Sequence, residues 1–203
     1  MASTFIIRKV TEALLGILRN DLATITTSPA TTIRAGRPES ASDVLDAETL
    51  LLYLYQVVES PFLKNVGPKA EPVSGNGILV RKDPLALELY YLIIPGASDT
   101  GFLETYDILG AAMRSFHDHG AFTLGDWVPS DSLLPALTAD EAKLQIHIDF
   151  NRLETADLIR IWEAVHHPYR LSVSYIVRTL QIDSNLTTGG GRVTSRNFDF
   201  EQQ

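Results

Sequence analysis

The sequence contains no cysteine. This absence excludes disulfide bonds, thiolate metal ligands and thiol nucleophiles. Basic residues are also scarce, with 17 Lys and Arg against 25 Asp and Glu, which gives a formal net charge of −8. No run of Lys or Arg is present that would bind the phosphates of a nucleic acid or the headgroups of an anionic membrane. We therefore expect neither nucleic acid nor membrane among the partners.

A long uninterrupted apolar run is missing as well. The first twenty residues, MASTFIIRKVTEALLGILRN, are apolar at many positions, but four charged residues interrupt them, namely Arg8, Lys9, Glu12 and Arg19. This pattern differs from the basic leader and continuous apolar core of a signal peptide, and it is too broken for a membrane span. The sequence predicts neither.

The overall composition is that of a globular domain. Hydrophobic residues make up 45% of the 203 residues and charged residues 21%, which is typical of a folded soluble chain. A chain of this length buries roughly 70% of the surface that its unfolded form exposes. One domain with its own hydrophobic core is the expected organisation.

Apolar periodicity predicts three helices and four main strands. Helices are expected over 4–22, 98–120 and 154–165, the last with Thr155 as its cap. Strands are expected over 49–60, 83–96, 143–151 and 170–183, the first two buried on both faces. Between them, residues 24–47 read as a long connection with a short strand near Ile33, and residues 60–82 as an extended loop or open hairpin. Pro168 ends the third helix, because it forces His167 out of the α region.

This order of elements predicts the fold class. Helix, strands, helix, strand, helix and strand indicate an α/β (α+β) domain over residues 1–184, with a single mixed sheet and about three helices packed on it. Residues 185–203 are expected to form a separate C-terminal arm. The tract Gly189-Gly190-Gly191 is expected to be a flexible tether. A β-capable segment, RVTSRNFDF, follows it and is either a frayed tail or a strand that adds to the sheet edge of another subunit.

Catalytic patterns are weak throughout. His117 and His119 flank Asp118 at a helix end, and His147, His166 and His167 could complete a metal site. A solvated role near the helix carbonyls explains the same histidines. The glycines are not placed between a strand and a helix as a phosphate loop requires, and there is no Gly-x-Ser-x-Gly elbow. The sequence therefore predicts no catalytic, cofactor-binding or metal-binding residues and no enzyme.

Four segments, taken in order, resemble a known family. They are VVESPFLKN, PLALELYYLIIPGA, ETYDILGAAMRSFHDHGAF and LETADLIRIWEAVHHPYRLSVSYIVRTLQIDS. Together they are similar to the cap-protein domain of extracellular contractile injection systems, the phage-tail-like particles that include the antifeeding prophage and the virulence cassettes. The resemblance covers residues 4–184 and is densest from the Trp162 helix through Pro168-Tyr169-Arg170 into the last predicted strand.

The resemblance implies a tail-terminator-like subunit. Six copies would form a ring that closes the distal end of the inner tube and sheath, so the implied partners are a homo-hexamer, the tube protein and the sheath protein. No cofactor is implied. Assembly in the cytoplasm would precede incorporation into an injection particle, which stays in the cytoplasm or is released.

Two surfaces are expected to carry these contacts. A ring needs two different patches on each chain, and the loop that contains Phe62, Leu63, Lys64 and Asn65 is expected to lie at the subunit interface. The arm is expected to pair with the last sheath layer through a segment of nine residues: Arg192, Val193, Thr194, Ser195, Arg196, Asn197, Phe198, Asp199 and Phe200. Two alternatives remain open at this point, a tube-length regulator or assembly factor that leaves the finished particle, and a histidine-based metal enzyme.

Overall fold

The computed structural model describes residues 5–25, 32–38, 49–62, 69–73, 77–96, 102–127, 135–182 and 186–191. Its helices are α1 (Ile6–Ile25), α2 (Phe102–Asp118), α3 (Leu124–Trp127), α4 (Ala139–Ala142) and α5 (Thr155–Ala164). Its strands are β1 (Thr32–Ala35), β2 (Thr49–Glu59), β3 (Lys69–Val73), β4 (Gly77–Arg81), β5 (Leu85–Pro95), β6 (Ala121–Thr123), β7 (Gln145–Asn151), β8 (Val173–Ile182) and β9 (Thr187–Gly191).

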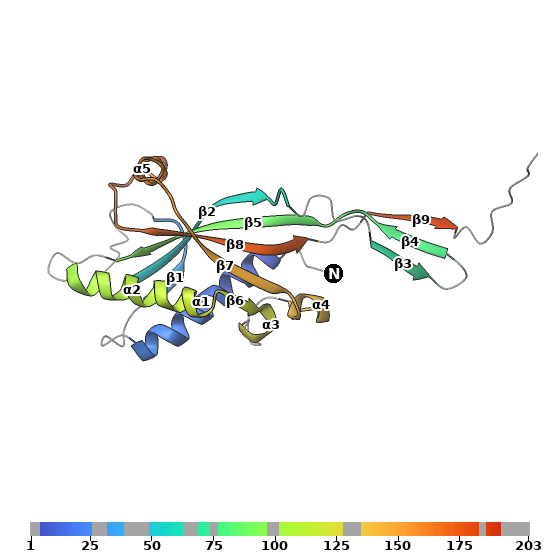
Figure 1. Cartoon of the computed structure of the whole chain (residues 1–203), viewed down its shortest axis with the longest axis horizontal. Helices are drawn as coiled ribbons and strands as arrows, with labels where there is room; N and C mark the ends of the chain where they lie inside the picture. Colours follow the sequence, from blue (N-terminus) through green and yellow to red (C-terminus); the bar gives the residue numbers. More distant parts are fainter. Residues whose placement is uncertain are drawn as a thin grey trace, which may run out of the picture.

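A six-stranded sheet forms the body of the molecule, in the order β1-β2-β5-β8-β7-β6. β1 and β2 are parallel, and the other neighbours are antiparallel. Figure 1 shows α1 and α2 along one side of this sheet and α5 on the other. The predicted α+β class with a mixed sheet and three main helices is confirmed, and α3 and α4 are two short helices that the apolar pattern did not indicate.

The main core lies between α1, α2 and the sheet. Five residues that the helical spacing placed on one face of α1 are fully buried, Ile6, Val10, Leu14, Ile17 and Leu18. They pack against residues of β2, β5 and β8 that include Leu52, Tyr91 and Val177. Burial of such side chains contributes about 1.5–3 kcal/mol each relative to exposure. Packing of the apolar face therefore fixes α1 on the sheet.

A smaller core lies under α5, on the opposite face. Trp162 of α5 and Val165, the C-cap residue of this helix, pack against Leu51, Leu92 and Ile94 of β2 and β5. The Trp162 Nε1 donates a hydrogen bond to the Ser172 hydroxyl at 3.3 Å, which satisfies the one polar atom of the indole ring. This face of the sheet, opposite α1 and α2, is the outer face, and α5 covers only one end of it. The prediction that β2 is buried on both sides therefore holds for its first residues, whereas Val57, farther along the strand, is 45% exposed.

The prediction that Thr155 caps the N-terminus of α5 was wrong. The helix begins at Thr155, and its N-cap is Glu154, which makes no side-chain capping bond. The capping box belongs instead to α4, where Thr138 and Glu141 satisfy each other's backbone N–H groups. A threonine before an apolar stripe has the right chemistry for a cap, but the position depends on where the chain leaves the preceding turn.

A second sheet, in the order β3-β4-β9, extends from the end of the six-stranded sheet (Figure 1). The pairing of β5 with β8 ends at Leu85 and Ile182, and the pairing of β4 with β9 continues it from Arg81 and Thr187. The Lys82 N–H donates to the Leu186 carbonyl at 3.1 Å between the two. We call this three-stranded extension the projecting sheet.

The projecting sheet bears on two expectations. Of the extended loop or open hairpin expected over residues 60–82, the structure shows the hairpin, formed by β3 and β4. The glycine tract at 189–191 is not a tether, because it lies in β9 and pairs with residues 77–79 of β4. Glycine is depleted in strands, so the tract reads as a linker, but a backbone ladder needs no side chain. The proposed division at residues 184 and 185 stays a prediction.

A buried ion pair ties α1 to the segment before β7. The Lys9 ammonium lies 2.9 Å from a Glu141 carboxylate oxygen, and both residues are fully buried. The same Lys9 nitrogen reaches the Ala136 carbonyl at 3.5 Å, and the same Glu141 oxygen accepts the Thr138 N–H at 2.8 Å. Each charge is therefore paired and hydrogen-bonded, as burial requires.

Loss of Lys9 alone should strongly destabilise the fold. Lys9→Met leaves the Glu141 carboxylate buried without its cation, which typically costs about 3–5 kcal/mol in the free energy of unfolding. Adding Glu141→Gln removes the uncompensated charge, keeps an acceptor for the Thr138 N–H and should restore much of this loss. Urea unfolding of both variants measures the difference.

The neighbouring residue supplies the control. Arg8 pairs with Glu12 at 3.2 Å on the exposed side of α1, so Arg8→Met should change stability by less than about 1 kcal/mol. Equal losses for Lys9→Met and Arg8→Met would contradict a structural role for the buried pair.

Candidate assembly surfaces

The projecting sheet offers two open backbone edges. β4 lies in its centre, and within the residues that the structure describes no strand pairs with the outer edge of β3 or of β9. An open edge is a row of unpaired N–H and C=O groups that can pair with another chain. The arm residues 192–200 lie outside the described residues, and in chain order they follow Gly191 at the end of β9. The predicted pairing of this arm with sheath stays a prediction.

The predicted interface loop begins at a fixed turn. The Ser60 N–H donates to the Ala86 carbonyl at 2.9 Å, and its hydroxyl donates to the Glu88 carboxylate at 3.1 Å. Ser60 and Glu88 are both buried. Phe62 follows two residues later and is 85% exposed. The other three residues of the prediction, Leu63, Lys64 and Asn65, lie outside the described residues.

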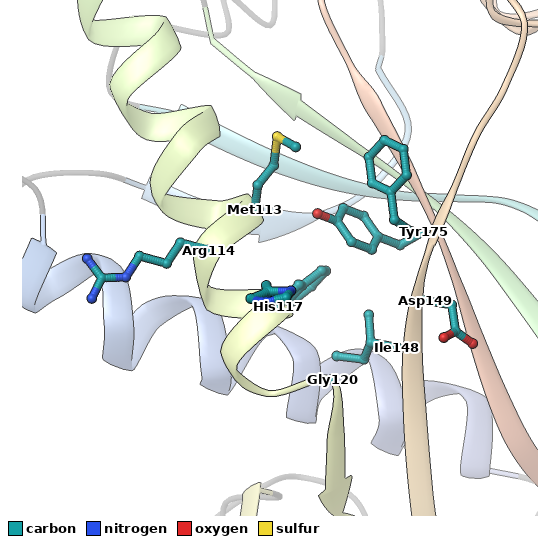
Figure 2. Close-up of a pocket in the computed structure, with 9 residues that line it drawn as sticks. Met113, Arg114, His117, Gly120, Ile148, Asp149 and Tyr175 are labelled. Carbon is teal, nitrogen blue, oxygen red and sulfur yellow. The ribbon is translucent and has the colours of Figure 1, made fainter.

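An aromatic groove opens between α2 and β7 (Figure 2). Its volume is about 610 Å³, and its lining residues come from α2, the turn after it, β7 and β8: Met113, Arg114, Phe116, His117, Gly120, Ile148, Asp149, Phe150 and Tyr175. In Figure 2 the Tyr175 ring points from β8 toward α2, whereas Arg114 points away from the groove. We call this the α2–β7 groove.

Tyr175 stands at the centre of the groove between two other rings. Phe116 contacts it edge-on with ring centroids 5.1 Å apart, and Phe150 does the same at 5.5 Å. Edge-on pairs of this kind are favourable beyond their buried area. Phe150 is nevertheless 56% exposed, although the strict alternation of residues 143–151 placed it with the buried Ile146 and Ile148. The sheet reaches past its helical cover at this point.

The open part of β7 explains that exposure. β6 pairs only with residues 145–147 of β7, and the Ile148 N–H donates to the Gly120 carbonyl at 2.8 Å. Beyond Ile148, none of the described strands lies on that side of β7. The groove was not predicted from the sequence, because its residues are spread over three elements. The one sequence signal was an aromatic residue at the end of an alternating strand.

The outer face of the sheet carries a hydrogen-bonded polar set. The hydroxyls of Tyr55 and Ser174 share a hydrogen bond at 2.9 Å, and the Asn151 amide donates to both, at 3.2 and 3.0 Å. Beside them, Arg178 forms an ion pair with Asp149. These contacts join β2, β7 and β8 across the sheet and hold the side chains in one arrangement.

The five histidines are distributed over separate surroundings. His119 lies 3.2 Å from the Asp21 carboxylate and contacts Trp127 edge-on, while His117 lines the groove. His147 is exposed on β7, His167 contacts the Trp162 ring, and His166 has a backbone φ of 57° at the turn after α5. Among the described residues, no three acidic or histidine side chains converge as metal ligands would.

No helix within the described part of the chain is both long and apolar enough to cross a membrane.

Comparison with known proteins identifies the family. The family model of the Pvc16 N-terminal domain matches residues 9–196. The chain belongs to this family. The resemblance drawn from the sequence is thereby confirmed, and the match extends past residue 184 into the predicted arm. The search of curated protein sequences finds no match.

Two solved structures share the fold. The first is the PVC sheath/tube terminator of an extracellular contractile injection system in its extended state, with a TM-score of 0.65 at 15% identity. It matches 97% of this chain and 64% of the terminator chain. The second is the tube-terminating cap of the anti-feeding prophage, with a TM-score of 0.52 at 18% identity, over 94% of this chain and 60% of the cap chain. The chain thus spans about three fifths of the length of each. The predicted tail-terminator-like fold is confirmed.

The tyrosines of the core should make stability fall at high pH. Burial raises the pKa of Tyr175 to about 12 and also raises the pKa of Tyr91. An unfolded tyrosine ionises near pH 10, so between pH 10 and 12 the unfolded state releases protons that the folded state keeps. The free energy of unfolding must therefore decrease as pH rises through this window.

Urea unfolding at pH 9 and pH 11 measures this decrease. Tyr175→Phe should lose less stability over the interval than the unchanged chain. Tyr106→Phe, at an exposed position on α2, is the control and should behave like the unchanged chain. An identical decrease in all three proteins would contradict the assignment to Tyr175.

Proposed function

We propose that this protein is a structural subunit that terminates the tube and sheath of a contractile phage-tail-like injection particle. The observation that carries the proposal is the shared fold with the PVC sheath/tube terminator, which extends over 97% of the chain. The family match over residues 9–196 and the likeness to the anti-feeding prophage cap support it. The work of such a subunit is binding by shape, without catalysis.

In this proposal six copies form a ring at the distal end of the particle. A cyclic ring of identical chains needs two unlike surfaces on each chain, one for each neighbour. The turn that carries Phe62 and the α2–β7 groove are two such surfaces in the described structure. The loop residues Phe62, Leu63, Lys64 and Asn65 belong to the interface between subunits.

The arm would attach the ring to the sheath. Residues 192–200 continue from β9, and the projecting sheet carries the end of β9 away from the six-stranded body. A segment that starts there is well placed to meet a different chain. Its sequence, RVTSRNFDF, contains the β-forming residues Val193, Thr194, Phe198 and Phe200, which favour pairing with a sheet edge.

The ring has a direct test. Purified protein, studied by mass photometry over a concentration series, should form hexamers, alone or on the ends of isolated tubes. Mass spectrometry of finished particles should detect the chain as a permanent component. A protein that stays monomeric when bound to tube ends would contradict the ring, and absence from finished particles would favour an assembly factor.

Removal of residues 192–203 tests the arm separately. The truncated chain should assemble as the full chain does, because the described core does not include these residues, but it should co-sediment poorly with sheath. Reversing the order of residues 192–200 within the full chain is a control of equal length and composition. Unchanged sheath binding by the truncated chain would contradict the role of the arm.

A further inference from the structure

The outer edge of β9 presents a full set of backbone hydrogen-bonding groups. The Lys82 N–H donates to the carbonyl of Leu186 directly opposite, and in an antiparallel pair every second residue directs both of its backbone groups toward the partner strand. The even-numbered residues of β9 therefore face β4, whereas Thr187, Gly189 and Gly191 direct their N–H and C=O groups outward. This edge thus offers three donors and three acceptors to a further strand.

The outer edge of β3 is blunted in comparison. The same alternation makes Lys69, Glu71 and Val73 face β4. Ala70 and Pro72 then face outward, and proline has no N–H to donate. Proline on an edge strand is one of the ways in which proteins prevent pairing with other chains. In contrast, the sequence of β9, TTGGG, contains neither proline nor a charged residue.

The part of the arm that follows β9 is the nearest strand that could cover this edge. Twelve residues, 192–203, follow Gly191 in the sequence. A hairpin turn takes about two to five residues, which leaves enough of them to run back along the five residues of β9. A segment joined directly to the edge has an effective concentration there on the order of millimolar. A strand from another molecule has to compete with it.

The arm also supplies side chains that the end of β9 lacks. Glycine has no side chain to pack on either face of a sheet, and it weakens a strand for this reason. Aromatic residues opposite edge glycines compensate for that weakness. A turn of about four or five residues sets Phe198 opposite Gly189 or Gly190. The aromatic residue then covers backbone that would otherwise stay open.

Charge favours the chain's own arm over a strand from a second copy. Arg192 and Arg196 balance Asp199 and Glu201, so residues 192–203 carry no net charge. Approach of a second copy brings together two chains that each carry a net charge of −8, which opposes the encounter. The arm reaches β9 without this repulsion.

We propose that residues 192–203 of the free chain fold back along β9 as a fourth strand of the projecting sheet, and leave it when a partner takes the arm. The fold-back is independent of the proposed function. The release rests on it, because in that role sheath and β9 compete for the same strand. Until sheath arrives, a β-forming segment and an open sheet edge cover each other, which prevents pairing with wrong chains.

Hydrogen exchange at single-residue resolution tests the fold-back on the monomeric chain. The outward Gly189 amide should be protected in the unchanged protein, because it donates to the arm. Replacing residues 192–203 with a Gly-Ser segment of equal length should raise its exchange rate about tenfold or more, as the loss of a local pairing does. The Gly190 amide faces β4. It should change by less than about threefold and is the internal control.

Three outcomes would overturn the fold-back. The first is equally fast exchange of the Gly189 amide in both proteins. The second is equal protection in both, which would show that another part of the chain covers the edge. The third is protection that grows with protein concentration, which would assign the strand to a second copy. None of these outcomes depends on rings or on sheath, so this inference and the proposed function can fail separately.

Purified sheath tests the release. Adding it to the unchanged chain should raise the exchange rate of the Gly189 amide toward the rate in the Gly-Ser variant, because the arm leaves β9. If sheath binds while Gly189 stays protected, the two do not compete for one strand and the release is wrong. Failure of sheath to bind at all would overturn the release together with the proposed role of the arm.

Discussion

The antiparallel pairing of β5 with β8 is the interaction on which the rest of the structure depends. These two strands occupy the centre of the six-stranded sheet, with β2 and β7 as their outer neighbours. Both helical layers pack on residues that the pair positions, Tyr91 and Val177 toward α1 and α2, and Leu92 and Ile94 toward α5. The same pairing continues through Lys82 and Leu186 into β4 and β9. One ribbon thus forms the centre of the core and the base of the projecting sheet.

The side-chain contacts around this ribbon hold several surfaces in a fixed shape. Glu88 is buried near the start of β5, where it accepts a hydrogen bond from Ser60 and thereby holds the turn before Phe62. Tyr175 is positioned by two aromatic neighbours, and Tyr55, Asn151 and Ser174 are bonded to one another on the outer face. Side chains held in this way present a constant shape to a partner, which reduces the entropy lost on binding.

Much of the fold could be predicted from the sequence, because its long elements have strong periodicity. Two patterns indicate which face of an element is buried: the apolar stripe from Ile6 to Leu18 on α1, and the alternation around Ile146 and Ile148 on β7. The projecting sheet could not be predicted, since its third strand consists of Thr187, Thr188 and three glycines, and only the β4 backbone opposite makes it a strand. The short strand β6 and the helices α3 and α4 fall below the length at which a period is visible.

The candidate surfaces were less predictable than the fold. Phe62 was predicted from its loop to lie at an interface, and that stays a prediction. The hydrogen bond between Ser60 and Glu88 at the start of this loop joins residues 28 apart in the chain, which the sequence does not indicate. The α2–β7 groove depends on Phe116, Phe150 and Tyr175, which come from three elements. Sequence periodicity places each of these residues on a face of its own element. It gives no information on where the helical layer stops short of the sheet, which is what leaves Phe150 uncovered.

The continuous ribbon from the body into the projecting sheet has a mechanical consequence. Hydrogen bonds between antiparallel strands lie perpendicular to the strand direction. A force that pulls β9 along its length therefore acts on the whole row of bonds to β4, and through Lys82 and Leu186 on the row between β5 and β8, all at the same time. Strands loaded in shear resist separation far better than strands peeled apart one bond at a time. A sudden displacement of a partner attached near Gly191 would be transmitted to the centre of the domain as tension along its strongest axis.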